Sequence, residues 1–467
     1  MIIGVVSGMT IHAQEVWSLE KCINTALANS LLVESNQISL KSAEIDLTQA
    51  RHSRYPSLSA GSNVGWNFGR TIDPTRNEFI TETFFNNGFN INSSVSLYNG
   101  GRINKTISQS LTNNKAALWD LEQVKRDIAL NVATLYLNIL FAKENLAIAE
   151  NQLSLTKNQA DQLKKLIAVG NRPDNEMLDI DAQAATNEQN IVEARNSLSI
   201  NILNLKQLIR LDPGYNLDIV SPDQVTVDTD PDMVTFDEVY EKALGSQASV
   251  TAGEFRLKSA EIGEKIAKSD MYPSIGAGGS MRSNYSNKGF QVTGYNQQIF
   301  EQKVIINNQE VTVGFPQEVP IIEKSPYFSQ FGDNLSYAVG LSLNMPIYSN
   351  YSIRAGIQRA KLNRELASNN LTQIRENLKI TVGQALFDAR AAKSRYQATE
   401  KSRLAQLRLY ENAIKRFEIG AVNSFELTRI KTQLETSELN SLVARYNYLF
   451  RSKVLDFYLG KPIRLSN

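Results

Sequence analysis

Two glutamates occupy matching positions in the sequence, and their spacing suits electrostatic rather than catalytic chemistry. Glu176 follows Gly170 by six residues, and Glu426 follows Gly420 by the same interval. A carboxylate in the first turn of a helix interacts favourably with the helix dipole, by about 0.3–1 kcal/mol. Arg429 stands three residues beyond Glu426, a spacing at which two side chains of one helix can pair. Glu426 and Arg429 are therefore candidates for an ion pair near a helix start.

Other patterns that might bind a ligand or catalyse a reaction fail on residue type. The acidic stretch Asp228–Asp232 has Met233 where a calcium loop needs glycine and Val239 where it needs glutamate. His12 and His52 have no Ser, Cys or Asp constellation that their spacing justifies. The "NGGR" stretch lacks a Walker lysine. We expect no catalytic residue, no metal site and no cofactor, and we interpret the acidic stretch as a solvated linker.

The composition excludes further classes of protein. The 467 residues include 49 basic and 48 acidic side chains, so no nucleic-acid partner is expected. The single cysteine, Cys22, excludes a disulfide framework and lies in a helical pattern, where we interpret it as a core residue. After the first dozen residues, no stretch reaches the roughly 18 apolar residues of a membrane-spanning helix. The first residues, "MIIGVVSGMTIHAQ", resemble an export signal, which we place at 1–14.

The elements that position these residues come from one unit used twice. "LKSAEIDLTQARHSRYPSL" at Leu40–Leu58 and "LKSAEIGEKIAKSDMYPSI" at Leu257–Ile275 agree at ten of nineteen positions, at an offset of 217. Further along, an offset of 250 aligns Gly170 with Gly420 and Glu176 with Glu426. We therefore divide the chain into a first repeat at 15–211, a linker at 212–233, a second repeat at 234–460 and a tail at 461–467.

Each repeat contains two strands. Apolar and polar residues alternate over about 57–69, 88–98, 274–285 and 334–346. The alternation by itself fits a soluble antiparallel sheet equally well. Two details favour a membrane barrel: the polar positions are Ser, Asn and Gly rather than charged residues, and Trp66, Phe68 and Tyr98 stand at strand ends.

Each repeat also contains a long helical hairpin, at 102–210 and at 352–459. Neither Pro nor Gly interrupts Arg102–Val169, and its apolar residues follow the spacing of a coiled coil. At about 1.5 Å per residue, this helix is about 100 Å long, and Ser352–Ile419 has the same length. The return helix Asp174–Arg210 is shorter, and we expect it to meet the helix before Tyr55 end to end.

Four strands per chain cannot close a membrane barrel, because the smallest such barrels use eight. An open sheet edge in lipid leaves backbone groups without hydrogen-bond partners. Several copies must therefore pool their strands; two copies supply eight and three supply twelve.

The duplicated order of strand hairpin and helical hairpin resembles the TolC family of outer-membrane efflux proteins. The matching motifs are "YPSL" before the first strand, "LYNGGR" between strand and helix, and the tips "LIAVG…EMLDIDAQ" and "FEIG…ELTRIKTQ". The resemblance implies a mainly α fold with a β-barrel part, assembled as a homotrimer. A periplasmic α-barrel would continue into a twelve-stranded barrel in outer-membrane lipid. It further implies a periplasmic adaptor and an inner-membrane pump as partners.

The resemblance also suggests roles for individual residues. The helical tips, with Gly170, Asn171, Gly420 and Ala421, would dock the adaptor. Glu426 would lie at the narrow inner end of the duct as part of a periplasmic gate, and Arg429 stands where the family has a second carboxylate.

We therefore expect an outer-membrane export duct that conducts its substrates passively and is not an enzyme. The alternatives are a coiled-coil fibre protein and a periplasmic adaptor, although an adaptor would normally carry one helical hairpin rather than two. An extra segment between Arg282 and Gly332 lies between strands on the side opposite the helices, so we expect it to face the cell exterior.

Overall fold

The computed structural model describes residues 16–73, 77–81, 83–170, 172–221, 227, 229–306 and 309–461. The expected signal segment and nearly all of the tail lie outside these residues. The chain forms two compact units, described separately below. The helical unit comprises Met1–Ile45, Leu111–Ala260 and Asn363–Asn467, and the sheet unit comprises Asp46–Ser110 and Glu261–Leu362.

The duplication extends to every long helix. The helices of the two repeats correspond in pairs of equal or nearly equal length: α1 Leu19–Asn29 with α5 Phe236–Ser246, α2 Leu31–His52 with α6 Ala248–Ser269, α3 Arg102–Ala168 with α8 Ser352–Glu418, and α4 Glu176–Ile209 with α9 Ser424–Tyr458. The caps correspond too, because Ser18 accepts a hydrogen bond at the start of α1 and Thr235 does so at the start of α5. The predicted internal duplication is confirmed.

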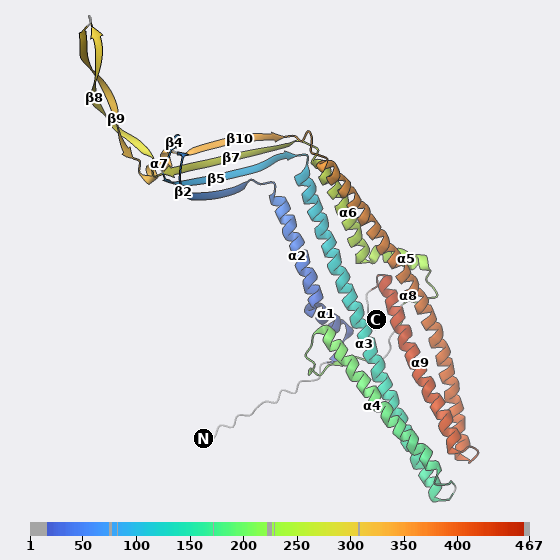
Figure 1. The fold of residues 1–467 in the computed structure, drawn as a ribbon. Coiled ribbons are helices and arrows are strands. Elements are labelled where there is room, and N and C mark those ends of the chain that lie inside the picture. Colours follow the sequence, from blue (N-terminus) through green and yellow to red (C-terminus); the bar gives the residue numbers. More distant parts are fainter. Residues whose placement is uncertain are drawn as a thin grey trace, which may run out of the picture. The chain divides into compact units, whose positions relative to one another are not determined.

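One core of the helical unit is formed by α1, α3 and α4 around Cys22, which is fully buried. Burial raises the pKa of its thiol to about 12, so Cys22 is an inert packing residue, as predicted. The side-chain amide of Asn29 donates to the carbonyl of Ile209 at 3.1 Å. The end of α4 thus meets the junction of α1 and α2, which is the predicted end-to-end arrangement (Figure 1).

By length and composition, α3 is the one described helix apolar enough to cross a membrane. Its apolar residues between Ile128 and Leu140 are buried in the core with α1 and α4, so packing accounts for this composition. The sequence analysis counted only continuous apolar runs and therefore did not single out this stretch.

The acidic part of the linker between the repeats contacts α8. Asp228 lies outside the described residues, but Asp230 and Asp232 both bind Lys393 of α8, at 2.6 and 2.7 Å. The Arg390 guanidinium donates to the carbonyl of Pro231 at 2.9 Å. Both carboxylates are exposed to solvent, as expected of a solvated linker, while cations of α8 anchor the segment.

The sheet unit contains four antiparallel strands in the order β10, β7, β5, β2 (Figure 1). Their bounds are β2 Ser57–Asn67, β5 Phe84–Asn99, β7 Ser274–Ser286 and β10 Ser336–Asn344. β5 pairs with β7, so the two repeats share one sheet. A short ribbon, β3 Thr71–Asp73 with β4 Glu78–Ile80, follows β2 in the chain.

The extra segment of the second repeat forms a long antiparallel ribbon, β8 Phe290–Ile306 with β9 Gln309–Lys324, followed by the short helix α7 Tyr327–Asp333. Gln330 of α7 is buried and bonds both backbone groups of Ser286, the last residue of β7, at 3.0 and 2.9 Å. The segment after β9 is therefore fastened to the end of β7. Apolar and polar residues alternate only weakly in β8 and β9. The sequence therefore predicted an insertion here but not this ribbon.

Candidate functional site

One face of the four-stranded sheet is mainly apolar, and one of its rows is apolar from edge to edge. The register aligns Ala60, Ile91, Met281 and Tyr337 across all four strands. On β10, Val339 is 91% and Leu341 76% exposed in the single chain. Trp66 lies near one end of the sheet and Tyr98 near the other, as aromatic girdles require. This face matches the lipid-facing side of a membrane strand.

The opposite face carries small and polar side chains. Ser59, Asn92, Ser280 and Ala338 form one aligned row, and Gly61, Asn90, Arg282 and Ser336 form the next. Among the described strands, β2 and β10 each pair on one side only, so both outer edges are open. An edge of this kind cannot persist in lipid, so closure must come from outside the single chain.

The tips of both helical hairpins are built on glycines in the left-handed conformation. Gly170 has φ of 73° and Gly420 has φ of 78°, values that other residues adopt only with strain. At the second tip, the amide of Ala421 donates to the carbonyl of Arg416 at 2.9 Å, which closes the end of α8. Asn171, the remaining predicted tip residue, lies outside the described residues.

Glu426 and Arg429 form a two-pronged ion pair within one chain. The Arg429 guanidinium donates to the two carboxylate oxygens at 2.8 and 3.0 Å. Asn423 caps α9 by accepting from the Glu426 amide at 2.9 Å. The hydrogen bond from Arg429 lowers the pKa of Glu426, so in the single chain Arg429 neutralises this carboxylate. In the single chain, the two side chains therefore pair within one helix.

A tip residue that the sequence analysis did not select connects the two hairpins. The Arg172 guanidinium donates to the carbonyls of Phe417 and Val422 at 3.2 and 2.9 Å and lies over the Phe417 ring. It also approaches the Glu176 carboxylate at 3.4 Å, and both side chains are largely buried, at 12% and 14% exposure. The sequence places this arginine directly before the predicted helix start at Pro173, which marks it as a tip residue. Its acceptors could not be predicted, because they are backbone groups of a distant segment.

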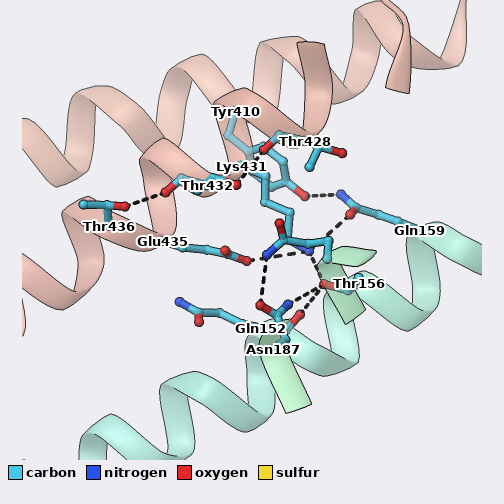
Figure 2. Close-up of polar contacts among 11 residues, drawn as sticks. Gln152, Thr156, Gln159, Asn187, Tyr410, Thr428, Lys431, Thr432, Glu435 and Thr436 are labelled. Carbon is cyan, nitrogen blue, oxygen red and sulfur yellow. Dashed lines mark hydrogen bonds and ion pairs between the residues drawn. The ribbon is translucent and has the colours of Figure 1, made fainter. Parts of the chain in front are cut away.

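A second connection between the hairpins lies deeper, around Lys431 of α9 (Figure 2). This lysine is 2% exposed and donates to the Thr156 hydroxyl at 2.5 Å and to the Gln159 side chain at 3.2 Å, both on α3. Gln159 donates in turn to the Tyr410 hydroxyl of α8 at 2.6 Å. Asn187 of α4 donates to Thr156 at 2.8 Å, so all four helices of the two hairpins meet here.

The charges in this layer are only loosely compensated. The Glu435 carboxylate lies 3.7 Å from the Lys431 ammonium, beyond hydrogen-bond distance, and that oxygen has no hydrogen-bond partner. Burial lowers the pKa of Lys431 and raises those of Glu435 and Glu438. A buried, weakly paired charge contributes little net stability but disfavours other packings of the same helices.

No arrangement for metal binding occurs in the described part of the chain, where no three His, Cys, Asp or Glu side chains gather. His52 interacts with the carbonyl of Thr48 in its own helix, at 2.8 Å. His12 lies outside the described residues.

The chain combines a sheet that has a lipid-compatible face with two long helical hairpins, one from each repeat. This combination defines an outer-membrane channel subunit. The chain belongs to the outer membrane efflux protein family, whose model matches residues 22–209 and 239–461. The resemblance drawn from the sequence motifs is therefore confirmed. No curated protein sequence matches the chain significantly.

Solved structures agree with this assignment at the level of the fold. CusC superimposes with a TM-score of 0.75 at 16% identity, covering 95% of this chain and 92% of that one. The outer membrane protein VceC of Vibrio cholerae gives 0.72 at 14% identity, covering 96% and 97%. The CmeC outer membrane channel of Campylobacter jejuni gives 0.72 at 16% identity, covering 96% and 87%.

Family membership decides between the functional classes considered above. The protein is an outer-membrane efflux channel with a long periplasmic helical portion. Members of the family are transport ducts rather than enzymes, in agreement with the expectation. The fibre and adaptor alternatives are set aside.

Proposed function

We propose that the protein is the outer-membrane duct of a tripartite export system and conducts its substrates passively from an inner-membrane pump and a periplasmic adaptor to the exterior. The observation that carries the proposal is the four-stranded sheet, apolar on one face and open at both edges. Such a sheet is stable in lipid only if β10 of one copy pairs with β2 of the next.

Three copies would supply twelve strands, in keeping with the homotrimers of this family. The apolar face, with Val339 and Leu341, would then face lipid, and the row with Asn90 and Arg282 would line the pore. The polar lining would keep the duct wet, and passive conduction needs no further chemistry.

The helical tips are the proposed contact with the adaptor, through Gly170, Asn171, Gly420 and Ala421. Glu426 and Arg429 are the proposed gate, three pairs around one axis. Because each pair is closed within its own chain, it would reduce the charge at the mouth rather than tie neighbouring chains together. The buried contacts of Arg172 and Lys431 support a role in holding the two hairpins of each chain together.

Native mass measurement of the detergent-extracted protein tests the assembly. We expect a trimer; a monodisperse monomer that retains its strands would contradict the proposal. A photo-crosslinking residue at Ala421 should capture a periplasmic adaptor subunit. The same residue at Thr312 of the β8–β9 ribbon is the matched control and should not. Capture of the adaptor from Thr312 and not from Ala421 would invert the proposed orientation.

A further inference from the structure

The two faces of the β8–β9 ribbon differ in charge. Residues opposite each other in an antiparallel pair share a face, and the register runs without a shift from Gly294 opposite Ile321 to Val304 opposite Val311. We call one side of this stretch the uncharged face. Its apolar members are Phe300, Val304, Val311, Val313, Phe315, Val319 and Ile321, and Asn296, Gln298, Gln302 and Gln317 lie among them.

The other side of the same stretch carries every charge. Glu301, Lys303 and Glu318 lie there, and Lys303 pairs at 3.3 Å with Glu310, which continues the same side one pair further on. On the uncharged face, Phe300 and Phe315 lie opposite each other and are 49% and 48% exposed in the single chain. The charged face also exposes apolar side chains, with Tyr295, Ile299 and Ile305 at 65%, 71% and 72%, so the absence of charge distinguishes the uncharged face. Depletion of charged residues is typical of the core of a surface that another protein covers.

The ribbon also needs a partner for its stability. Among the described residues, β8 and β9 pack closely on each other and make at most marginal contact with other elements. An isolated two-stranded ribbon is marginally stable in water. Its base is fixed, because the Ser325 amide donates to the carbonyl of Gly289 at 3.2 Å next to the buried Gln330. The ribbon beyond that base therefore relies on a covering surface.

Lipid is a poor covering for this face. Gln298, Gln302 and Gln317 would lose their hydrogen bonds to water in acyl chains and gain none, at a cost of roughly 1–3 kcal/mol each. A protein surface that carries both apolar side chains and amides can cover the apolar residues of this face and form hydrogen bonds with its glutamines.

The route by which copies of the ribbon can join is restricted by two prolines. Pro316 and Pro320 both lie in β9, opposite Ile299 and Tyr295. A proline within a ladder must direct its missing N–H to the outer edge. The outer edge of β9 therefore lacks two donors, which disfavours strand addition of β8 from a neighbouring copy. The remaining way for copies of the ribbon to join is to pack face against face.

We infer that the uncharged face is an interface between copies of this chain, and that the three ribbons of a trimer pack together through it. Rotational symmetry brings identical faces around one axis, where like charges would repel. The uncharged face is the side that avoids this repulsion, and its amides can bond one another across the contact. The inference rests on the proposed trimer and adds to it a second interface beyond the barrel.

Cysteine labelling on intact cells tests the inference. The variants Gln302→Cys and Gln317→Cys place a thiol on the uncharged face, and Gln297→Cys and Thr312→Cys are the matched controls on the charged face. Cys22 is buried and does not compete. A membrane-impermeant maleimide should react roughly tenfold more slowly at the two uncharged-face positions, as expected for a thiol reached only through transient opening.

The purified trimer in detergent separates the outcomes. If the two uncharged-face thiols still react slowly with the maleimide in the purified trimer, contact between copies is supported. If they react quickly after purification although the trimer persists, another exterior molecule is the partner and the inference is overturned. Equal labelling of both faces in an intact trimer also overturns it and leaves the proposed function standing. A monomeric protein would instead refute the proposed function.

Discussion

The two hairpin tips descend from one unit, yet they distribute their charges differently. At the offset of 250, Arg172 corresponds to Val422 and Arg429 corresponds to Asp179. The first tip has its arginine in the loop, where it reaches across to backbone carbonyls of the second tip. The second tip has its arginine inside the helix, where it binds a glutamate of the same helix.

This difference shows how a duplicated unit becomes asymmetric at its contacts. Lys431 corresponds to Asp181, so the second hairpin supplies the buried cation while the first supplies its acceptors, Thr156 and Gln159. One tip connects the hairpins, and the other carries an exposed charge pair that is available to ions. Four measurements test this contrast.

The largest effect is expected at Lys431. Lys431→Ala removes a buried side chain, leaves the Gln159 oxygen without its donor and leaves Thr156 with Asn187 as its remaining side-chain donor, so the opening free energy of α9 should fall by roughly 2–4 kcal/mol. Native-state hydrogen exchange measures this quantity. The repeat-matched control Asp181→Ala removes an exposed carboxylate and should change it by no more than about 0.5 kcal/mol. Equal effects of the two substitutions would show that the buried layer does not distinguish the repeats.

A smaller effect is expected at the tip connection. Arg172→Ala removes the side-chain donor from the Val422 carbonyl and leaves the Phe417 carbonyl with the Gly420 amide alone, so amides of the second tip should open more easily, by about 1–3 kcal/mol. Arg172→Lys should recover only part of this loss, because an ammonium lacks the planar fork. Arg429→Ala is the control and should leave exchange at both tips unchanged. The interpretation of Arg172 as a connection fails if its removal affects α4 alone.

The gate pair should affect ions more than stability. Removing the arginine in Arg429→Ala would leave three uncompensated Glu426 carboxylates in a trimer, so single-channel recordings should show higher cation selectivity and conductance. Glu426→Ala should raise conductance and shift selectivity towards anions. Unchanged conductance and selectivity in both variants would return Glu426 to the role of a helix-start residue, which Glu176 serves in the first repeat.

The smallest effect concerns pH. Burial raises the pKa of Glu435 above its ordinary value of 4.5, so the folded state binds more protons in the window between that value and the raised one. Stability from this group is therefore gained as the pH falls through the window, and the midpoint of heat unfolding should rise slightly on mild acidification. Glu435→Gln should reduce the rise but not abolish it, because burial also raises the pKa of Glu438.

Glu400 acts in the opposite sense and in a lower window. The hydrogen bond from Arg403 lowers its pKa from 4.5 to about 2, so its stabilisation is present above 4.5 and is lost as the pH falls towards 2. If the unsubstituted protein instead loses stability continuously as the pH falls from neutral, this result would contradict the raised pKa of Glu435.

The sequence alone determined the features that depend on neighbours along the chain. The repeat follows from two segments that match at ten of nineteen positions, and the sheet faces follow from the alternation around Val64 and Leu341. The long helices follow from uninterrupted coiled-coil spacing over Arg102–Val169, and the turns follow from Gly170 and Gly420. Each of these signals is local, because backbone geometry repeats every two residues in a strand and every 3.6 in a helix.

Only the tertiary structure decided which of several partners each charge takes. The spacing of Glu426 and Arg429 allows pairing within or between chains, and in the single chain the two side chains meet within one helix. Lys431 meets an acceptor 275 residues away, and Arg172 meets carbonyls whose positions exist only after both hairpins have folded. The ribbon likewise acquired its two unlike faces only through the register of β8 with β9. Such contacts join residues far apart in sequence, and no local periodicity encodes them.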